Sequence, residues 1–176
     1  MRLIYEPKGK AREFSPLALT LFEGCDHECR YCYVPRTVRK GQVWTNRPQV
    51  RRGWRWQQLE DECAKLKGDP RQILMSFVGD PYCSANIWGF TANVLDIMLR
   101  HYLVPALLTK GGERCLVDMH QFIKFGRHIK VGQTLTFVDG GLSLDWEPGA
   151  ASPESRMRAL RELHDAGVPT WASLEP

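Results

Sequence analysis

The sequence LALTLFEGCDHECRYCY, at residues 17–33, is the most informative stretch of this chain. It opens with a short apolar run from Leu17 to Phe22, which predicts a β-strand. Three cysteines with CxxxCxxC spacing, Cys25, Cys29 and Cys32, follow at the carboxyl end of that strand. Three thiolates on a short loop can bind three corners of a cubic iron–sulfur cluster, which leaves the fourth iron open for a chelating cosubstrate.

Strand-like and helix-like segments alternate along the rest of the chain. Nearly continuous apolar runs predict buried parallel strands, and apolar residues at helical spacing predict helices between them. The last helix is the best marked, because Ser152 can cap it, Pro153 can take its first position and Gly167 can end it. The expected strands are 17–22, 73–78, 104–109, 129–137 and 168–174, and the expected helices are 53–66, 87–103, 113–125 and 152–167.

Five strands and four helices in β-α alternation predict an α/β fold with a parallel sheet. Such a sheet can close into a barrel or stay open and doubly wound, and both arrangements place ligand sites at the carboxyl ends of the strands. We expect a single domain over residues 1–176. The chain stops at Pro176, directly after the last expected strand, whose edge would be left uncovered, so we expect the domain to lack the C-terminal end of its barrel.

Composition favours a globular protein of the cytoplasm. Hydrophobic residues make up 43% and charged residues 25% of the 176 positions, as in folded domains. We find neither a signal-peptide pattern nor an apolar run of membrane-spanning length, so we expect a cytoplasmic protein with no membrane partner. Six cysteines in such a protein indicate metal or redox chemistry before disulfides.

The motifs resemble the radical S-adenosylmethionine (SAM) superfamily, whose signature is CxxxCx(aromatic)C after the first barrel strand. Tyr31 is the aromatic residue here. Later segments are similar to the spore photoproduct lyase-like branch, often labelled DNA repair photolyase-like. The resemblance extends over nearly the whole chain from about Leu17 onward and implies a partial (β/α) barrel that is truncated after its fifth strand. The similar segments are SFVGDPY (76–82), LTK (108–110), EPGAASPESRMRAL (147–160) and SLEP (173–176).

The resemblance implies an enzyme with two cofactors. Cys25, Cys29 and Cys32 would ligate a 4Fe–4S cluster, and SAM would bind to its open iron. The reduced cluster would cleave SAM to methionine and a 5′-deoxyadenosyl radical, which takes a hydrogen atom from the substrate. The reaction could be lyase-like or transferase-like. An electron donor, either a reductase or a protein of flavodoxin or ferredoxin type, is an expected partner.

The resemblance also implies residues that contact the cofactors. Tyr31 would pack beside the cluster. Gly79 and Asp80 stand where the superfamily has a Gly-Gly-Glu-like turn that meets the SAM amino group; an ordinary strand-ending turn is the alternative. Lys110 resembles the family's Thr-Lys pair and could bind the SAM carboxylate, or it could be a surface lysine. The literal Gly-Gly-Glu string at 111–113 follows the third strand and is expected to open a helix instead.

Three further residues are candidates near the same strand ends. Thr136 follows Thr134 at strand spacing and could bond the cosubstrate, although both are ordinary β-branched strand residues. Arg156 could anchor Glu147, reach the cosubstrate, or be a solvated helix arginine. Cys83 could act catalytically as a hydrogen donor or as an extra ligand, or it could be a plain loop cysteine.

A local excess of positive charge points to a nucleic-acid substrate. The stretch from Arg36 to Trp56 holds seven Lys or Arg and no Asp or Glu, while the rest of the chain carries 17 basic and 20 acidic residues. It also contains Trp44, Trp54 and Trp56. Cationic side chains can neutralise phosphates and tryptophans can stack on bases. The alternative is a solvated basic loop whose tryptophans cover the barrel.

Three other functions stay open at this point. A radical SAM enzyme could act on a peptide or a small molecule. A nucleic-acid-binding module without catalysis could hold zinc with the three cysteines and His27, although structural zinc sites usually use two close ligand pairs and no second pair follows. The chain could also be a fragment that holds its cofactors but leaves them half enclosed.

Overall fold

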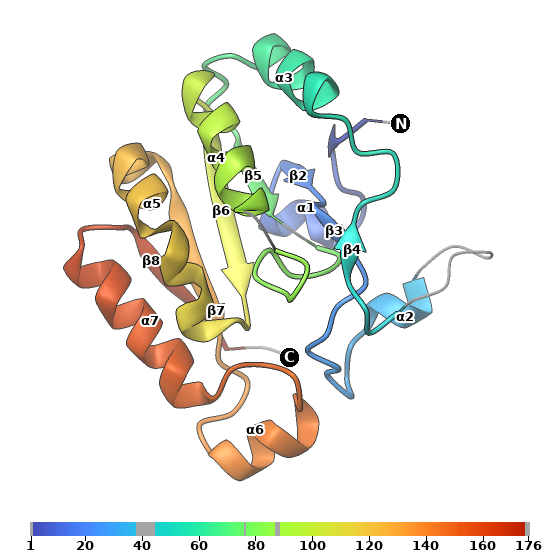
Figure 1. Cartoon of the computed structure of the whole chain (residues 1–176), viewed down its shortest axis with the longest axis vertical. Helices are drawn as coiled ribbons and strands as arrows, with labels where there is room; N and C mark the ends of the chain where they lie inside the picture. The colour runs from blue at the N-terminus through green and yellow to red at the C-terminus, as the bar shows by residue number, and fades with distance from the viewer. Residues whose placement is uncertain (1, 38–44, 76, 87–88, 175–176) are drawn as a thin grey trace.

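A six-stranded sheet forms the centre of the protein (Figure 1). The structure is a computed structural model that describes residues 2–37, 45–75, 77–86 and 89–174. The strand order is β1-β2-β5-β6-β7-β8, in which β1 pairs antiparallel with β2 and every other neighbouring pair is parallel. The strands are β1 (Ile4–Tyr5), β2 (Leu17–Leu19), β5 (Gln72–Met75), β6 (Val104–Thr109), β7 (Lys130–Thr134) and β8 (Thr170–Ser173).

The parallel strands follow one another in the sheet in the same order as in the sequence. A doubly wound sheet reverses its strand order near the middle, whereas a (β/α) barrel adds each new strand on the same side. The sequence left these two arrangements open. The strand order decides for an open segment of a (β/α) barrel, so the predicted fold class is confirmed.

Helices line one face of this sheet (Figure 1). They are α3 (Trp56–Lys65), α4 (Phe90–Arg100), α5 (Met119–Phe125) and α7 (Pro153–Asp165). Helix α7 packs on β7 and β8, and α4 packs on β6 and α5. The core between the layers consists of apolar side chains at helical spacing and on the strands, among them Leu59, Val94, Phe122, Val131 and Leu163. The ends predicted for the last helix are confirmed: the Ser152 side chain accepts a hydrogen bond from the Ser155 N–H, and Gly167 follows with φ of 78°.

The structure differs from the sequence prediction in its short elements. The expected strand 17–22 ends at Leu19, and Phe22 begins β3 (Phe22–Glu23), which pairs with β4 (Gln49–Val50) in a separate two-stranded sheet. The expected helix 113–125 divides into a 3-10 helix, η1 (Gly112–Asp118), and α5. The remaining elements that the sequence did not predict are β1, α1 (Ala11–Phe14), α2 (Val34–Thr37), η2 (Gly126–His128) and α6 (Gly140–Trp146). Four of these elements have two to four residues and are too short to show a hydrophobic period, and α6 has only seven.

Within the described residues, we find no helix that is both long and apolar enough to cross a membrane.

Candidate functional site

A cavity of about 510 Å³ runs along the sheet and reaches the carboxyl ends of the parallel strands, where Thr109, Thr134 and Ser173 line it. Cys25, Cys29 and Cys32 all line it, so the structure brings the three predicted metal ligands to one place. Strand-end residues complete the polar part of the lining, and the rest is largely apolar and aromatic. The site residues predicted from the sequence that line the cavity, besides the cysteines, are Gly79, Asp80 and Lys110.

The three cysteines lie on an irregular loop that turns at Glu28, whose φ is 52°. None of them is in a disulfide. Burial raises the pKa of the Cys25 thiol above its ordinary value, with the charge of Asp80 adding to the effect. Burial also raises the pKa of the Cys29 thiol to about 11. These thiols are therefore protonated in the metal-free chain at neutral pH, and a metal would displace the protons on binding. Three thiols around one open cavity fit a cluster that keeps an iron free.

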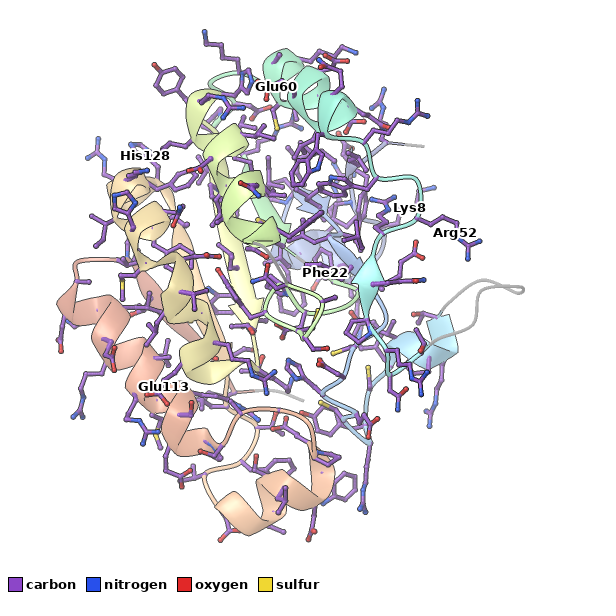
Figure 2. The ribbon with its side chains drawn as sticks, viewed as in Figure 1. Lys8, Phe22, Arg52, Glu60, Glu113 and His128 are labelled. Atoms are coloured by element: carbon purple, nitrogen blue, oxygen red, sulfur yellow. The ribbon has the colours of Figure 1, made fainter. Side chains whose placement is uncertain are left out.

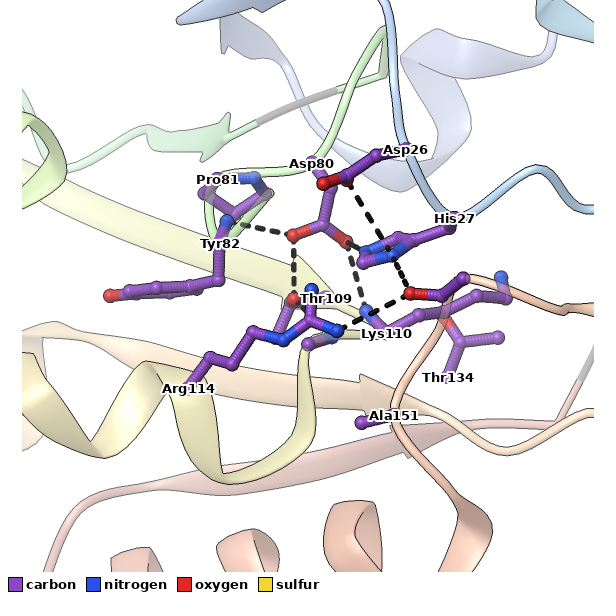
Figure 3. Close-up of polar contacts among 12 residues, drawn as sticks. Asp26, His27, Asp80, Pro81, Tyr82, Thr109, Lys110, Arg114, Thr134 and Ala151 are labelled. Carbon is purple, nitrogen blue, oxygen red and sulfur yellow. Dashed lines mark hydrogen bonds and ion pairs between the residues drawn. The ribbon is translucent and has the colours of Figure 1, made fainter. Parts of the chain in front are cut away.

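Asp80 is the centre of a buried hydrogen-bond network beside this loop (Figure 3). Its Oδ1 accepts from the Thr109 hydroxyl at 2.6 Å and from the Tyr82 N–H at 2.7 Å. Its Oδ2 accepts from the Lys110 N–H at 2.9 Å and lies 3.0 Å from His27 Nε2. Burial alone would raise the pKa of Asp80, but the charge of His27 and these hydrogen bonds lower it to about 2. The predicted SAM contact is therefore an ionised carboxylate with four protein partners.

His27 links the cysteine loop to two other segments. Its Nδ1 donates to the Gly149 carbonyl at 3.2 Å, and its Nε2 faces Asp80. Burial alone would lower the pKa of His27, but the charge of Asp80 outweighs it and raises that pKa. His27 could serve as a fourth zinc ligand only by giving up one of these partners.

The turn after α6 is hydrogen-bonded to the cysteine loop. The Arg30 N–H donates to the Trp146 carbonyl at 2.8 Å, and the Gly149 N–H donates to the His27 carbonyl at 3.0 Å. A Cβ atom on Gly149 would lie only 1.8 Å from the Asp26 carbonyl oxygen, so only glycine allows this approach of two backbones. The loop is thus docked against a segment more than a hundred residues away in the sequence.

Glu147 connects the same turn to the predicted cofactor residues. Its carboxylate accepts a hydrogen bond from the Tyr31 hydroxyl, lies 2.6 Å from Arg156 Nη2, and lies 3.9 Å from Lys110 Nζ. Burial would raise the pKa of Glu147, but the hydrogen bonds from Tyr31 and Arg156 outweigh it, so that pKa is lowered. The Tyr31 hydroxyl is also 3.1 Å from Thr136 Oγ1, which can donate to it.

The structure places three weaker candidates away from the cavity lining. Thr136 lies beyond the end of β7 and contacts Tyr31, whereas Thr134 lines the cavity. Arg156 is fully buried and anchors Glu147, so its interpretation as a solvated helix arginine is wrong. Cys83 is only 4% exposed and belongs to the hydrophobic core.

The basic stretch contains residues that support the fold and residues that are exposed. Arg51 is 9% exposed and donates to the backbone carbonyls of Arg2 and Leu3, so it supports the fold. Arg52 and Arg55 are exposed, and Arg52 extends outward from the molecule (Figure 2). Trp54 and Trp56 both pack on Phe90, with ring centroids 4.9 Å apart in each case. Trp54 thus covers the core as the alternative interpretation expected, while Trp56 stays 41% exposed. Positions 38–44, with Trp44, lie outside the described residues.

A glycine in β7 makes room for a tryptophan in the cavity wall. Gly132 pairs with Trp171 of β8, and the Trp171 indole occupies the space that a side chain at Gly132 would need, 2.4 Å from the position of its Cβ. Trp171 lines the cavity as a result.

Sequence reasoning missed the roles of His27 and Gly149. The sequence indicates His27 only as a possible zinc ligand and Gly149 only as part of a family-like segment. Their pairing spans 122 residues of sequence, and no local pattern reports such a contact. The Pro148-Gly149 dipeptide, a common turn signal, was the available hint.

Comparisons with solved structures agree with this architecture. A structure of a spore photoproduct lyase variant matches with a TM-score of 0.71 and 16% identity, over 96% of this chain and 47% of that chain. The chain has the fold of the matched part of spore photoproduct lyase. A second structure of that enzyme, with bound AdoMet and dinucleoside spore photoproduct, also gives a TM-score of 0.71, at 17% identity. The chain spans about half the length of the spore photoproduct lyase chains it matches.

A curated relative comes from an archaeon. An uncharacterized protein of Methanocaldococcus jannaschii is 33% identical over 159 residues, which is 87% of this chain and 57% of that protein. No family model matches the chain.

Proposed function

We propose that this chain is the cluster- and SAM-binding part of a radical SAM enzyme. The observation that carries the proposal is the gathering of Cys25, Cys29 and Cys32 around one cavity at the carboxyl ends of parallel strands. A likeness in fold to an enzyme whose structure holds AdoMet supports it. When bound, a 4Fe–4S cluster supplies the electron that cleaves SAM to methionine and a 5′-deoxyadenosyl radical, which then abstracts hydrogen from the substrate.

The chain's own residues would orient SAM. Lys110 lines the cavity, its Nζ lies 5.5 Å from the centre of the Tyr31 ring, and it would bind the SAM carboxylate. The four protein partners of Asp80 take up about as many acceptor sites as a carboxylate offers, so Asp80 would have to give up one of them to bind the SAM amino group. Gly79 has φ of 79°, and a Cβ there would lie 2.8 Å from the Phe22 carbonyl oxygen, so its turn fits closely against the segment before the cysteine loop.

The apolar walls would protect the reaction from water. Phe77, Leu108 and Trp171 line the cavity together with the cysteines. A radical that abstracts hydrogen is quenched by side reactions in an open, wet site, so a dry wall around the reacting atoms favours the intended transfer.

The first experiment is anaerobic reconstitution of the chain with iron and sulfide, followed by SAM, dithionite and an assay for 5′-deoxyadenosine. We expect the native chain to form the product and a Cys29→Ala variant to form none. A native chain that binds no cluster would overturn the proposal. A cluster that forms without product would limit the function of this chain to holding the cofactor.

A nucleic acid is the substrate that the surface supports best. Arg52 and Arg55 are exposed on either side of Trp54, and the partly exposed Trp56 follows them. Cations beside an exposed aromatic ring suit phosphates and bases. The spore photoproduct lyase structure with a dinucleoside ligand, which has the same fold, gives further support. An electron donor of flavodoxin or ferredoxin type, or a reductase, belongs to the same proposal.

The substrate class is tested by binding of a DNA duplex at several salt concentrations. Replacing Arg52 and Arg55 with glutamine should weaken binding. The slope of log K against log salt concentration should also become shallower by about 1 for each phosphate that is no longer neutralised. Arg51 is left unchanged, because it supports the fold. Unchanged binding in the double variant would instead favour a peptide or small-molecule substrate.

A zinc-bound module is the second candidate. Ligand atoms of Cys25, Asp26 and His27 lie within 4.8 Å of one another, which is close enough for a metal ion. The engagement of both His27 nitrogens argues against this interpretation. Metal analysis of the purified chain separates the two candidates, since zinc without iron or sulfide would favour the module.

A further inference from the structure

A buried carboxylate beside the cysteine loop has no part in the function proposed above. Glu147 follows α6, and its side chain is 0% exposed. Burying a carboxylate costs free energy unless it is paired and hydrogen-bonded, so the partners of Glu147 indicate what holds it there.

The two oxygens of Glu147 face different parts of the molecule. Oε2 lies 2.6 Å from Arg156 Nη2. Arg156 is itself fixed, because its Nη1 donates to the Thr134 carbonyl at 2.9 Å and its Nε to the Ala151 carbonyl at 2.8 Å. This half of the carboxylate is therefore tied to β7 and to the start of α7.

The other oxygen, Oε1, faces the cysteine loop. It accepts the hydrogen bond from the Tyr31 hydroxyl and lies 3.9 Å from Lys110 Nζ. Tyr31 stands between Cys29 and Cys32 in the sequence, and Lys110 lines the cavity with both of them. An ion pair that only joined α6 to α7 would leave this second oxygen without a role.

We propose that Glu147 is a positioning residue of the cluster site, which holds Tyr31 of the cysteine loop and Lys110 in place and offsets the charge of Lys110 there. The inference rests on the proposed function, because it concerns the cluster that the three cysteines would hold.

Glu147 and Lys110 place opposite charges beside the cysteine loop. Glu147 Oε1 accepts the hydrogen bond from the Tyr31 hydroxyl, and Lys110 Nζ lies 5.5 Å from the centre of the Tyr31 ring. Reduction of a cluster adds an electron, so a nearby cation favours the reduced form and a nearby anion opposes it. Removing each charge should therefore move the reduction potential of the cluster in opposite directions.

The experiment compares the reconstituted native chain with Glu147→Gln, Lys110→Met and the double variant. Both substitutions keep the approximate size of the side chain and remove its charge. The readouts are iron and sulfide content and the midpoint potential of the cluster, followed by electron paramagnetic resonance in a redox titration. We expect Lys110→Met to lower the potential, Glu147→Gln to raise it, and the double variant to fall between the two.

Glu113→Gln is the matched control. Glu113 also pairs with an arginine of α7, at 2.9 Å from Arg158 Nη2, and ties η1 to that helix, but it is 39% exposed (Figure 2). We expect this variant to leave the potential unchanged. A merely structural role of Glu147 would reduce cluster content without producing shifts of opposite sign.

Each outcome bears on a distinct claim. Opposite shifts at native cluster content support the inference. No shift, or shifts of the same sign, would overturn it while the proposed function stands. If Glu147→Gln does not fold, the test rests on Lys110→Met alone. A midpoint potential in Lys110→Met that is no lower than in the native chain would then count against the inference. A native chain that takes up no iron would defeat the proposed function and this inference together.

Discussion

The cysteine loop, residues 25–32, and residues 45–56 of the basic stretch are close in sequence but are held in different ways. The loop is bonded by distant segments, through His27 to Asp80 and Gly149 and through Tyr31 to Glu147. In the basic stretch, Arg51 and Trp54 serve the fold, while Arg52 and Arg55 are exposed. The loop is thus organised before any ligand binds, whereas the exposed arginines would be ordered by a partner. Substitutions in the two regions should therefore have different consequences.

The largest effect should come from the thiols of the loop. Cys32→Ala should abolish cluster assembly, because the remaining two cavity thiols cannot hold three irons. Cys83→Ala should leave iron and sulfide content unchanged, since Cys83 lies in the core rather than on the cavity. Iron and sulfide analysis after reconstitution checks both. Iron lost equally from the two variants would place Cys83 at the site.

The next largest effect should come from the turn that is hydrogen-bonded to the loop. In Gly149→Ala, the new methyl group would collide with the Asp26 carbonyl oxygen, so either the turn or the loop must move. We expect a loss of about 3 kcal/mol in the free energy of unfolding, measured with urea, together with weaker iron uptake.

Gly140→Ala is the matched control on α6. The nearest atom to a Cβ at Gly140 is Glu154 Oε1 at 3.8 Å, an ordinary contact. Stability in this variant should stay the same or rise slightly, because alanine favours a helix over glycine. A loss equal to that of Gly149→Ala would show that crowding against the cysteine loop is not the cause.

The two adjacent arginines of the basic stretch should respond in opposite ways. Arg51→Gln should cost about 2 kcal/mol of unfolding free energy, because it removes charged hydrogen bonds to two backbone carbonyls. Arg52→Gln should leave stability unchanged and weaken DNA binding. Urea unfolding and salt-dependent binding, run on both variants, check the contrast. Equal losses of stability would mean that Arg52 also supports the fold.

The smallest effect should be a pH dependence of the cluster-free chain. The pKa of Asp80 is lowered from 3.8 to about 2, so its contribution to stability is present above about pH 4 and is lost as the pH falls toward about 2. The pKa of His27 is raised above 6.5, so its contribution is complete below that value and is lost as the pH rises through the raised pKa. The pair should therefore stabilise the chain most between these limits.

The measurement is the Tm of the native chain and of His27→Gln across this range. We expect the difference to be on the order of 1 kcal/mol, or about 3 °C, near pH 5, and to shrink on both sides. His128→Gln, at an exposed position far from the site (Figure 2), should show no such profile. A difference that does not change with pH would mean that the pair is not ionised.

The sequence was informative where structure is set by local patterns. The five parallel strands and the four longer helices could be predicted, because runs and helical spacing of apolar residues mark them directly. The cysteine spacing likewise indicated that three thiols share one loop, and all three line one cavity; metal binding there stays a prediction. The apolar run 17–22 supplies strands to two different sheets, β2 to the six-stranded sheet and β3 to the two-stranded one. This division could not be predicted, since a two-residue strand such as β3 shows no hydrophobic period.

Contacts between residues that are far apart in the sequence and belong to no motif could not be predicted. Arg51 and Arg52 are neighbours with the same side chain, and only the position of the N-terminal backbone makes one of them buried. Asp80 was expected to face the cosubstrate, but it is also bonded to His27, Thr109 and Lys110, which come from two other segments. Burial and pairing of this kind depend on the assembled fold.

The packing of Trp171 over Gly132 gives the protein an optical reporter of its own. The fluorescence of an indole changes with the polarity of its surroundings and with nearby quenching groups. Since Trp171 forms part of the cavity wall, a molecule that enters the cavity alters the light it emits. Occupancy can therefore be followed in the unlabelled chain, and Trp171→Phe separates this signal from that of the other tryptophans.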